Sequence, residues 1–216
     1  MTREETPMAR SLPFAMPAIR STALAALSAL ALALSLAGQP AARAEPLRLT
    51  LDPAHTHILF KVNHLGLSNT VGQFDRFEGT VVLDPEAPED SSVSVSIEAA
   101  SIDTNNDARD SHLRGDDFFD TGTHPIITFE SLRVDPTSDQ SATVYGMLTL
   151  LGESRPVALR TRLNYLGEHP LPGQSGMVAG FTANATIDRT DFGMDAYAGA
   201  VGNEVVLLIN TEAVAP

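Results

Sequence analysis

The chain has 216 residues, no Cys, no Trp and a formal net charge of −13. This length suits one domain, or one domain preceded by a targeting segment. The lack of Cys excludes disulfide scaffolds, thiolate zinc sites, thiol nucleophiles and a lipid-modified N-terminal Cys. The acidic charge argues against nucleic acid and anionic membrane surfaces as the main partners.

Residues 1–44 have the order of segments that is typical of a secretory signal peptide. Arg20 precedes an uncharged run rich in Ala, Leu and Ser over residues 21–38, and the small-x-small triplet 42–44 follows it. A basic start, an apolar run and a small-residue cleavage site predict export and removal of this leader. The alternative is a retained membrane anchor, because the uncharged run approaches the length that spans a bilayer.

We predict cleavage between Ala44 and Glu45 and a periplasmic location for the mature domain, residues 45–216. Met16 is an alternative start, since residues 16–44 alone would form a complete signal peptide. Cleavage removes four Arg and two Glu, which leaves 10 basic and 25 acidic side chains and a net charge of −15.

The mature chain alternates apolar and polar residues over 46–213, which predicts half-buried β-strands. Eight or nine such runs with short, turn-rich connections favour an antiparallel sandwich or a closed barrel. The expected inward-facing residues include Ile58, Phe60, Val62, Val93, Val95, Ile97, Val157, Leu159, Leu163 and Tyr165. Small inward residues such as Gly79, Ala183 and Ala185 would either leave an open lumen or let larger neighbours pack.

One segment departs from the β pattern and predicts a short helix over roughly residues 106–114. The N-cap candidates Thr104, Asn105 and Asn106 stand just before Asp107, which favours a first helical turn. An aromatic pair, Phe118 and Phe119, follows the expected helix. A helix between strands of a barrel is expected to cover one end.

The sequence lacks the Gly-rich nucleotide loops, the nucleophile elbow and the HExxH zinc motif. A calcium loop beginning at Asp103 is rejected, because Ala108 stands where the turn needs Gly. A zinc site of His55, His57 and His64 is an alternative to hydrogen-bonded histidines at strand ends. We predict no metal site.

The segment RDSHLRGDDFFD, residues 109–120, combines basic, acidic and aromatic side chains. One interpretation is a polar rim with an apolar plug, suited to the head of an amphipathic ligand. The other is a solvated helix whose charges pair locally.

Four segments together resemble the YceI-like family of periplasmic polyisoprenoid-binding proteins. They are residues 55–85, 101–131, 146–160 and 180–194, and they include the patterns RDSHLRGDDFFD and LTLLGESRPV. The resemblance extends over about residues 48–213. It implies an all-β fold, a lipocalin-like eight-stranded antiparallel β-barrel with one short helix between strands. It also implies a hydrophobic lumen that holds an isoprenoid chain.

The residues at the family's histidine, aromatic and polar positions, together with Phe60 and Leu113, form our candidate ligand-binding set. This set is His55, Phe60, His64, Phe74, Phe77, Arg109, Asp110, His112, Leu113, Asp117, Phe118, Phe119 and Phe129. His57 departs from the family, which has an apolar or aromatic residue there, and this departure weakens the zinc alternative.

The resemblance implies an exported protein that binds an isoprenoid lipid, a ubiquinone-type quinone or a polyprenyl lipid, for carriage or storage. No other cofactor is expected. One alternative is an accessory module that presents the lipid or quinone to a membrane cytochrome b-type protein. A less favoured one is an enzyme that uses Asp110, His112 and His64. The oligomeric state stays open, with a dimer among the alternatives.

Overall fold

The structure, a computed structural model, describes residues 44–216, so nearly all of the predicted signal peptide lies outside the described residues. These residues are mostly β-strands, with one short α-helix and three 3-10 turns. The elements are β1 (Leu47–Leu51), β2 (His57–His64), β3 (Ser68–Phe74), β4 (Phe77–Leu83), η1 (Pro88–Asp90), β5 (Ser92–Glu98), η2 (Ala99–Ser101), β6 (Ile102–Asp103), α2 (Asp107–Leu113), β7 (Ile126–Ser138), β8 (Ser141–Leu150), β9 (Glu153–Glu168), β10 (Met177–Asp188), η3 (Arg189–Phe192) and β11 (Val201–Val214). Within residues 44–216, no helix is long and apolar enough to cross a membrane.

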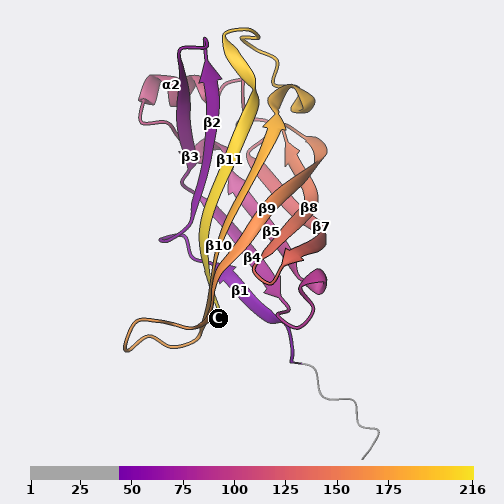
Figure 1. Ribbon diagram of the computed structural model, residues 1–216. Helices are drawn as coiled ribbons and strands as arrows, with labels where there is room; N and C mark the ends of the chain where they lie inside the picture. The colour runs from indigo at the N-terminus through magenta and orange to yellow at the C-terminus, as the bar shows by residue number, and fades with distance from the viewer. Residues whose placement is uncertain (1–43) are drawn as a thin grey trace, which may run out of the picture. The chain divides into compact units, whose positions relative to one another are not determined.

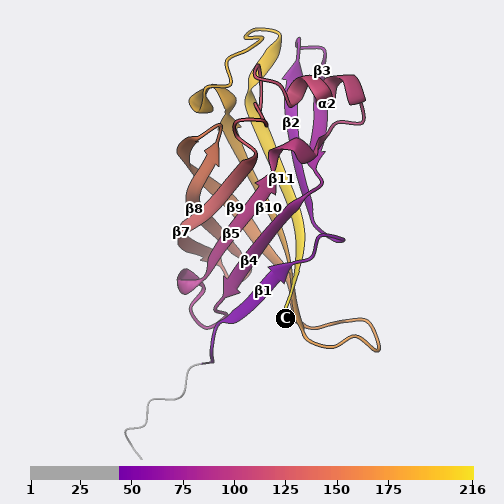
Figure 2. The ribbon, with the colours of Figure 1, turned by 180° about the vertical axis from the view of Figure 1, so that it is seen from behind.

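The eleven strands form a closed antiparallel barrel with eight strand positions (Figures 1 and 2). Three positions are each shared by two consecutive strands: β1 with β2, β3 with β4, and β5 with β6. β1 and β2 pair with the same edge of β11, while β4 pairs with β1 and β3 pairs with β2. Closure therefore runs from β11 back to β1 and β2, which confirms the predicted eight-stranded barrel.

The barrel has two ends, which differ in their covering. The end that carries α2 also holds the β2–β3 turn and η3, and we call it the α2 end (Figure 1). The opposite end holds η1, the β7–β8 turn and the loop between β9 and β10, and we call it the η1 end.

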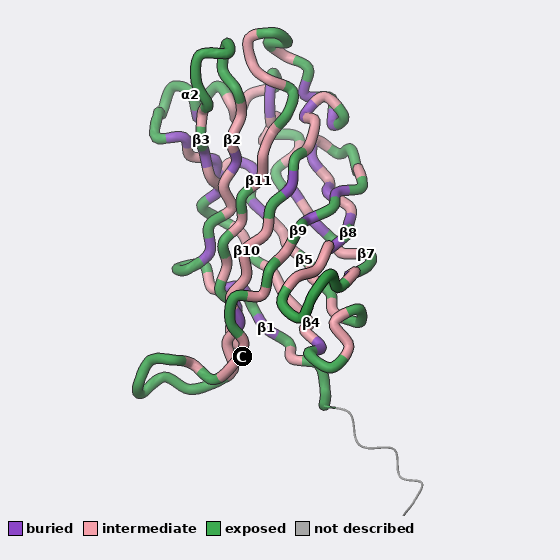
Figure 3. Tube along the Cα trace, in the orientation of Figure 1, coloured by how far each residue is buried: buried purple, intermediate pink, exposed green. Residues whose placement is uncertain are grey.

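Buried and exposed residues alternate along most strands, as the sequence predicts (Figure 3). Tyr165 is an exception: it was expected inside but is 43% exposed. The pairing of β9 with β10 shifts between Leu163 and Tyr165, which makes Asn164 an extra residue. Such a bulge reverses the alternation, so Leu166 lines the interior instead.

The observed helix α2 closely matches the predicted one. The side chain of Asn106 accepts a hydrogen bond from the backbone N of Arg109 at 2.9 Å and caps the helix. Buried Asp110 faces Thr104, the residue after β6, and its Oδ1 accepts hydrogen bonds from the backbone N of Thr104 at 2.9 Å and from the Thr104 hydroxyl. These bonds fix α2 against the barrel.

Candidate ligand-binding cavity

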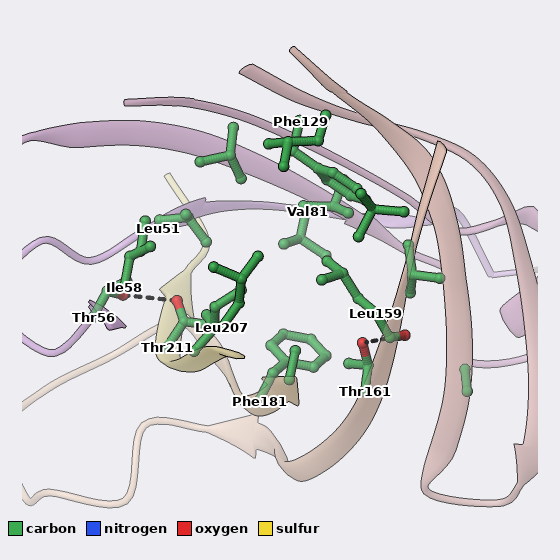
Figure 4. Close-up of a pocket in the computed structure, with 18 of the residues that line it drawn as sticks. Leu51, Thr56, Ile58, Val81, Phe129, Leu159, Thr161, Phe181, Leu207 and Thr211 are labelled. Atoms are coloured by element: carbon green, nitrogen blue, oxygen red, sulfur yellow. Dashed lines mark hydrogen bonds between the residues drawn. The ribbon is translucent and has the colours of Figure 1, made fainter. Parts of the chain in front are cut away.

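The barrel encloses a cavity of about 460 Å³ that is lined by all eight strand positions. Its wall is mostly aliphatic and aromatic, and alternate residues of the strands supply it because their side chains point inward. Figure 4 shows Val81, Leu159 and Leu207 reaching into this space from three different strands. The volume lies within the range of small-molecule binding sites, about 300–1,000 Å³.

Aromatic rings line the cavity at the α2 end. The rings of Phe60 and Phe74, on neighbouring strands, have centroids 5.8 Å apart. Phe119, which follows α2, meets Phe74 edge-on at 5.6 Å. Leu113 and Phe118 join them in the wall. The segment over and after α2 therefore supplies part of the apolar lining, which agrees with the interpretation of this segment as an apolar plug.

Two glycines leave the space that the rings of Phe60 and Phe129 occupy on the cavity wall. A Cβ at Gly72 would collide with the ring of Phe60, and one at Gly146 would collide with the ring of Phe129. Both rings therefore lie directly over the backbone of a glycine. Any larger residue at either glycine would push the ring away from the strand.

Six of the thirteen candidate ligand-binding residues lie on the cavity wall, and all six are apolar. They are Phe60, Phe74, Leu113, Phe118, Phe119 and Phe129. Phe77 is partly buried and packs against both core clusters without lining the cavity.

Arg109 and Asp110 of the candidate set form hydrogen bonds beside α2 instead of facing the cavity, as does Arg114, which lies outside the set. Arg109 donates from Nε to the hydroxyl of Thr104 and from Nη2 to its carbonyl, each at 2.7 Å. Arg114 donates to the carbonyls of Ala100 and Ile102, each at 2.8 Å. With Asp110, these groups hold the helix in place, and the cavity wall does not include them.

His112 and Asp117 lie at the outer surface of the α2 end, where they meet Tyr197. His112 Nε2 lies 3.3 Å from Asp117 Oδ2, and the Tyr197 hydroxyl lies 3.3 Å from both atoms. The ring of Tyr197 stacks on Phe118 with centroids 5.6 Å apart. The negative charge of Asp117 raises the pKa of Tyr197. This cluster joins the segment after α2 to the β10–β11 connection over the end of the cavity.

The three histidines of the zinc alternative are not brought together. His55 precedes β2, His57 begins this strand and His64 ends it. A strand rises about 3.3 Å per residue, so His57 and His64 are about 23 Å apart. His55 and His57 do not share a strand either, because residues 52–56 form the break between β1 and β2.

His55 instead contacts two carboxylates at this break. Its Nδ1 lies 2.7 Å from Asp52 Oδ2 and 4.0 Å from Glu212 Oε2. The hydrogen bond with Asp52 raises the pKa of His55 and lowers that of Asp52. The His55 nitrogen and one carboxylate oxygen each of Asp52 and Glu212 lie within 4.8 Å of one another, and His55 and Glu212 are exposed. The Asp52 carboxylate also accepts the backbone N–H of Ala54 at 2.9 Å, so the cluster braces the break.

Arg189 is a cavity-lining residue that lies outside the candidate set. It is 2% exposed, and it donates to the carbonyls of Met194, Val201 and Gly202. Burial lowers the pKa of this guanidinium. The only sequence signal was an Arg inside the matching segment 180–194, where nothing distinguished it from a surface charge.

At the η1 end the cavity wall becomes polar. The lining residues there come from the two turns and the strand ends beside them: Asp84, Ser91, Ser92, Ser138, Asp139, Gln140 and Ser141. Residues 138–140 are exposed, so this end of the lumen meets solvent. The two ends of the cavity therefore differ: aromatic rings line the α2 end, and polar groups line the η1 end.

A closed antiparallel barrel with an apolar lumen defines a protein that can enclose a small hydrophobic molecule. Comparison with known proteins narrows this class. The model of the YceI-like domain matches residues 49–213, and the chain belongs to this family.

Curated relatives carry the name UPF0312 protein. One from Pseudomonas paraeruginosa is 39% identical over 190 residues, which cover 87% of this chain and 96% of the relative. Another, from Shewanella putrefaciens, is 36% identical over 188 residues and has the same two coverages, 87% and 96%.

Solved structures share the fold. The YceI protein of Campylobacter jejuni aligns with a TM-score of 0.65 and 28% identity, over 71% of this chain and 90% of its own. BcnA of Burkholderia cenocepacia aligns with a TM-score of 0.68 and 23% identity, over 75% of this chain and 98% of its own. A polyisoprenoid binding domain from Saccharophagus degradans has a TM-score of 0.59 and 16% identity, with coverages of 79% and 99%.

Proposed function

We propose that this protein binds an isoprenoid lipid in the lumen of its barrel, for carriage or storage in the periplasm. The observation that carries the proposal is the cavity of about 460 Å³, with its mostly apolar wall and its aromatic end beneath α2. A flexible chain of branched hydrocarbon fits such a space without any specific polar contact along its length. The polyisoprenoid binding domain from Saccharophagus degradans, which shares the fold, supports this ligand class.

The free energy of burying an apolar chain is large enough for tight binding in this cavity. Each methylene-sized group removed from water contributes about 0.8 kcal/mol, so one five-carbon isoprene unit contributes about 4 kcal/mol. A few units exceed the cost of ordering the chain and losing its free motion, about 4–15 kcal/mol. Tight binding therefore requires apolar area alone, and the lining provides that area.

Charge around the lumen favours a neutral head group such as a quinone or an alcohol over a diphosphate. Among the residues that line the described cavity, Arg189 is the single cation, and three carbonyls already accept from it. Asp84 and Asp139 lie at the polar η1 end. A phosphate that entered there would meet the negative charge of these two carboxylates, which would repel it.

The ligand that the protein carries in its own host tests this function. We expect native mass spectrometry of protein purified from the periplasm to show a bound mass. Solvent extraction should release this mass as an isoprenoid quinone or polyprenyl lipid. Empty protein from the host that also fails to bind added short-chain ubiquinone would contradict the proposal.

A further inference from the structure

Two threonine hydroxyls interrupt the apolar wall of the lumen beside the break between β1 and β2. Thr56 ends the break and is 4% exposed, and Thr211 lies opposite it on β11. Their hydroxyl oxygens are 2.7 Å apart, and both residues line the cavity (Figure 4). Ile58, Leu207 and Phe181 lie in the same stretch of wall. Thr161 also lies there, and its hydroxyl donates to the Leu159 carbonyl at 3.4 Å.

The hydrogen bonds of this pair are not needed by the fold. Each hydroxyl has one proton, and one of the two is shared between Thr56 and Thr211. The other can reach only the Glu212 carbonyl, by a long bond of 3.4 Å from Thr56 or 3.2 Å from Thr211. That carbonyl already accepts the backbone N–H of Asp52 at 2.9 Å. Removing both hydroxyls would therefore leave no buried backbone group without a partner.

A polar pair in the cavity wall that satisfies no backbone group gains nothing over two valines of the same shape. The pair does offer a ligand a hydrogen-bonding group in a part of the wall that is mostly apolar. A hydroxyl both donates and accepts, and the long bond to Glu212 can be exchanged for a shorter one to a group inside the lumen. In an apolar surrounding such a bond is stronger than at the surface.

We infer that Thr56 and Thr211 form a subsite that recognises one neutral oxygen, a carbonyl or a hydroxyl, on the isoprenoid ligand. The inference rests on the proposed function and adds to it the position of the polar group. An oxygen held at this pair leaves the hydrocarbon chain free to run towards Phe60 and Phe74 at the α2 end. The buried cation Arg189 lies at that opposite end, so a charged head is not the group that this subsite fits.

The test compares three probes on the whole mature domain: a short-chain ubiquinone, geranylgeraniol and squalene. The first carries carbonyls, the second a hydroxyl and the third no oxygen. In the double variant Thr56→Val/Thr211→Val we expect affinity for an oxygen-bearing probe to fall about 5- to 30-fold, the worth of one buried hydrogen bond. Affinity for squalene should not fall. The probe that loses more identifies a carbonyl or a hydroxyl as the recognised group.

Two further variants separate this effect from damage to the barrel. Thr182→Val removes a hydroxyl on the outer face of β10 and should leave all three affinities unchanged. Thr56→Ser/Thr211→Ser keeps both hydroxyls and should retain the preference for oxygen-bearing probes. The subsite is excluded, while the proposed function stands, if the double Val variant has wild-type affinity for all three probes. The same holds if its affinity for all three falls by an equal factor. If the wild type binds none of the three probes, both the subsite and the proposed function are overturned.

Discussion

Replacing Ala183 with Trp should weaken isoprenoid binding by roughly three orders of magnitude while the barrel stays folded. Ala183 lies on β10 and lines the cavity, next to Thr161 and Ile209 on the flanking strands. An indole there occupies the space of about one isoprene unit, whose burial contributes about 4 kcal/mol. Because the native chain has no Trp, the fluorescence of the new side chain also reports whether it sits in an apolar, unquenched lumen.

The matched control is Thr182→Trp, one residue along the same strand. Thr182 is not among the residues that line the cavity, so the same indole placed there points to the outer face. We expect this variant to bind a short-chain ubiquinone as the wild type does. Equal binding by the two Trp variants, with both folded, would mean that the ligand does not occupy the lumen.

The second large effect is expected at Arg189. Arg189→Met should lower the free energy of unfolding by at least about 3 kcal/mol, measured by urea denaturation. The guanidinium is buried and donates to the carbonyls of Met194, Val201 and Gly202, which join η3 and the start of β11. Without it, three carbonyls in a buried position lose a donor, and each such loss costs about 1–3 kcal/mol.

Arg162→Met serves as the control for Arg189→Met. Arg162 is exposed on β9, and surface substitutions of this kind change stability by about 0.5 kcal/mol or less. A loss at Arg189 no larger than the loss at Arg162 would show that the carbonyls at the α2 end find other donors, such as water.

The sequence predicted the features of the fold that depend on local pattern. Alternation along the strands, read with the family resemblance, predicted the eight-stranded barrel, and the caps before Asp107 predicted the helix. The breaks between β1 and β2 and between β3 and β4 were not predictable. The first break arises because β1 and β2 both pair with β11, and the second because β3 pairs with β2 while β4 pairs with β1. These pairings join residues that are far apart in the chain. The inward position expected for Tyr165 was wrong because a bulge is invisible to alternation.

In the cavity too, some residues were predictable from the sequence and others were not. Apolar candidates such as Phe60 and Phe129 line the lumen because strand periodicity alone decides their direction. Polar side chains have many partners within reach, and sequence does not choose between them. Thr56 meets Thr211 across 155 positions of sequence, and Tyr197 meets His112 across 85. A cytochrome b-type partner stays a prediction.

The central claim is that the ligand lies inside the barrel, and methyl NMR of the protein with bound ubiquinone tests it most directly. We predict nuclear Overhauser effects between the isoprenoid methyl groups and the methyls of Val81, Leu159 and Leu207, which line the lumen. Leu67 and Val71 are exposed on the outside, at 82% and 54%, and should show none. Effects confined to Leu67 and Val71, with the lumen methyls unchanged, would contradict the account.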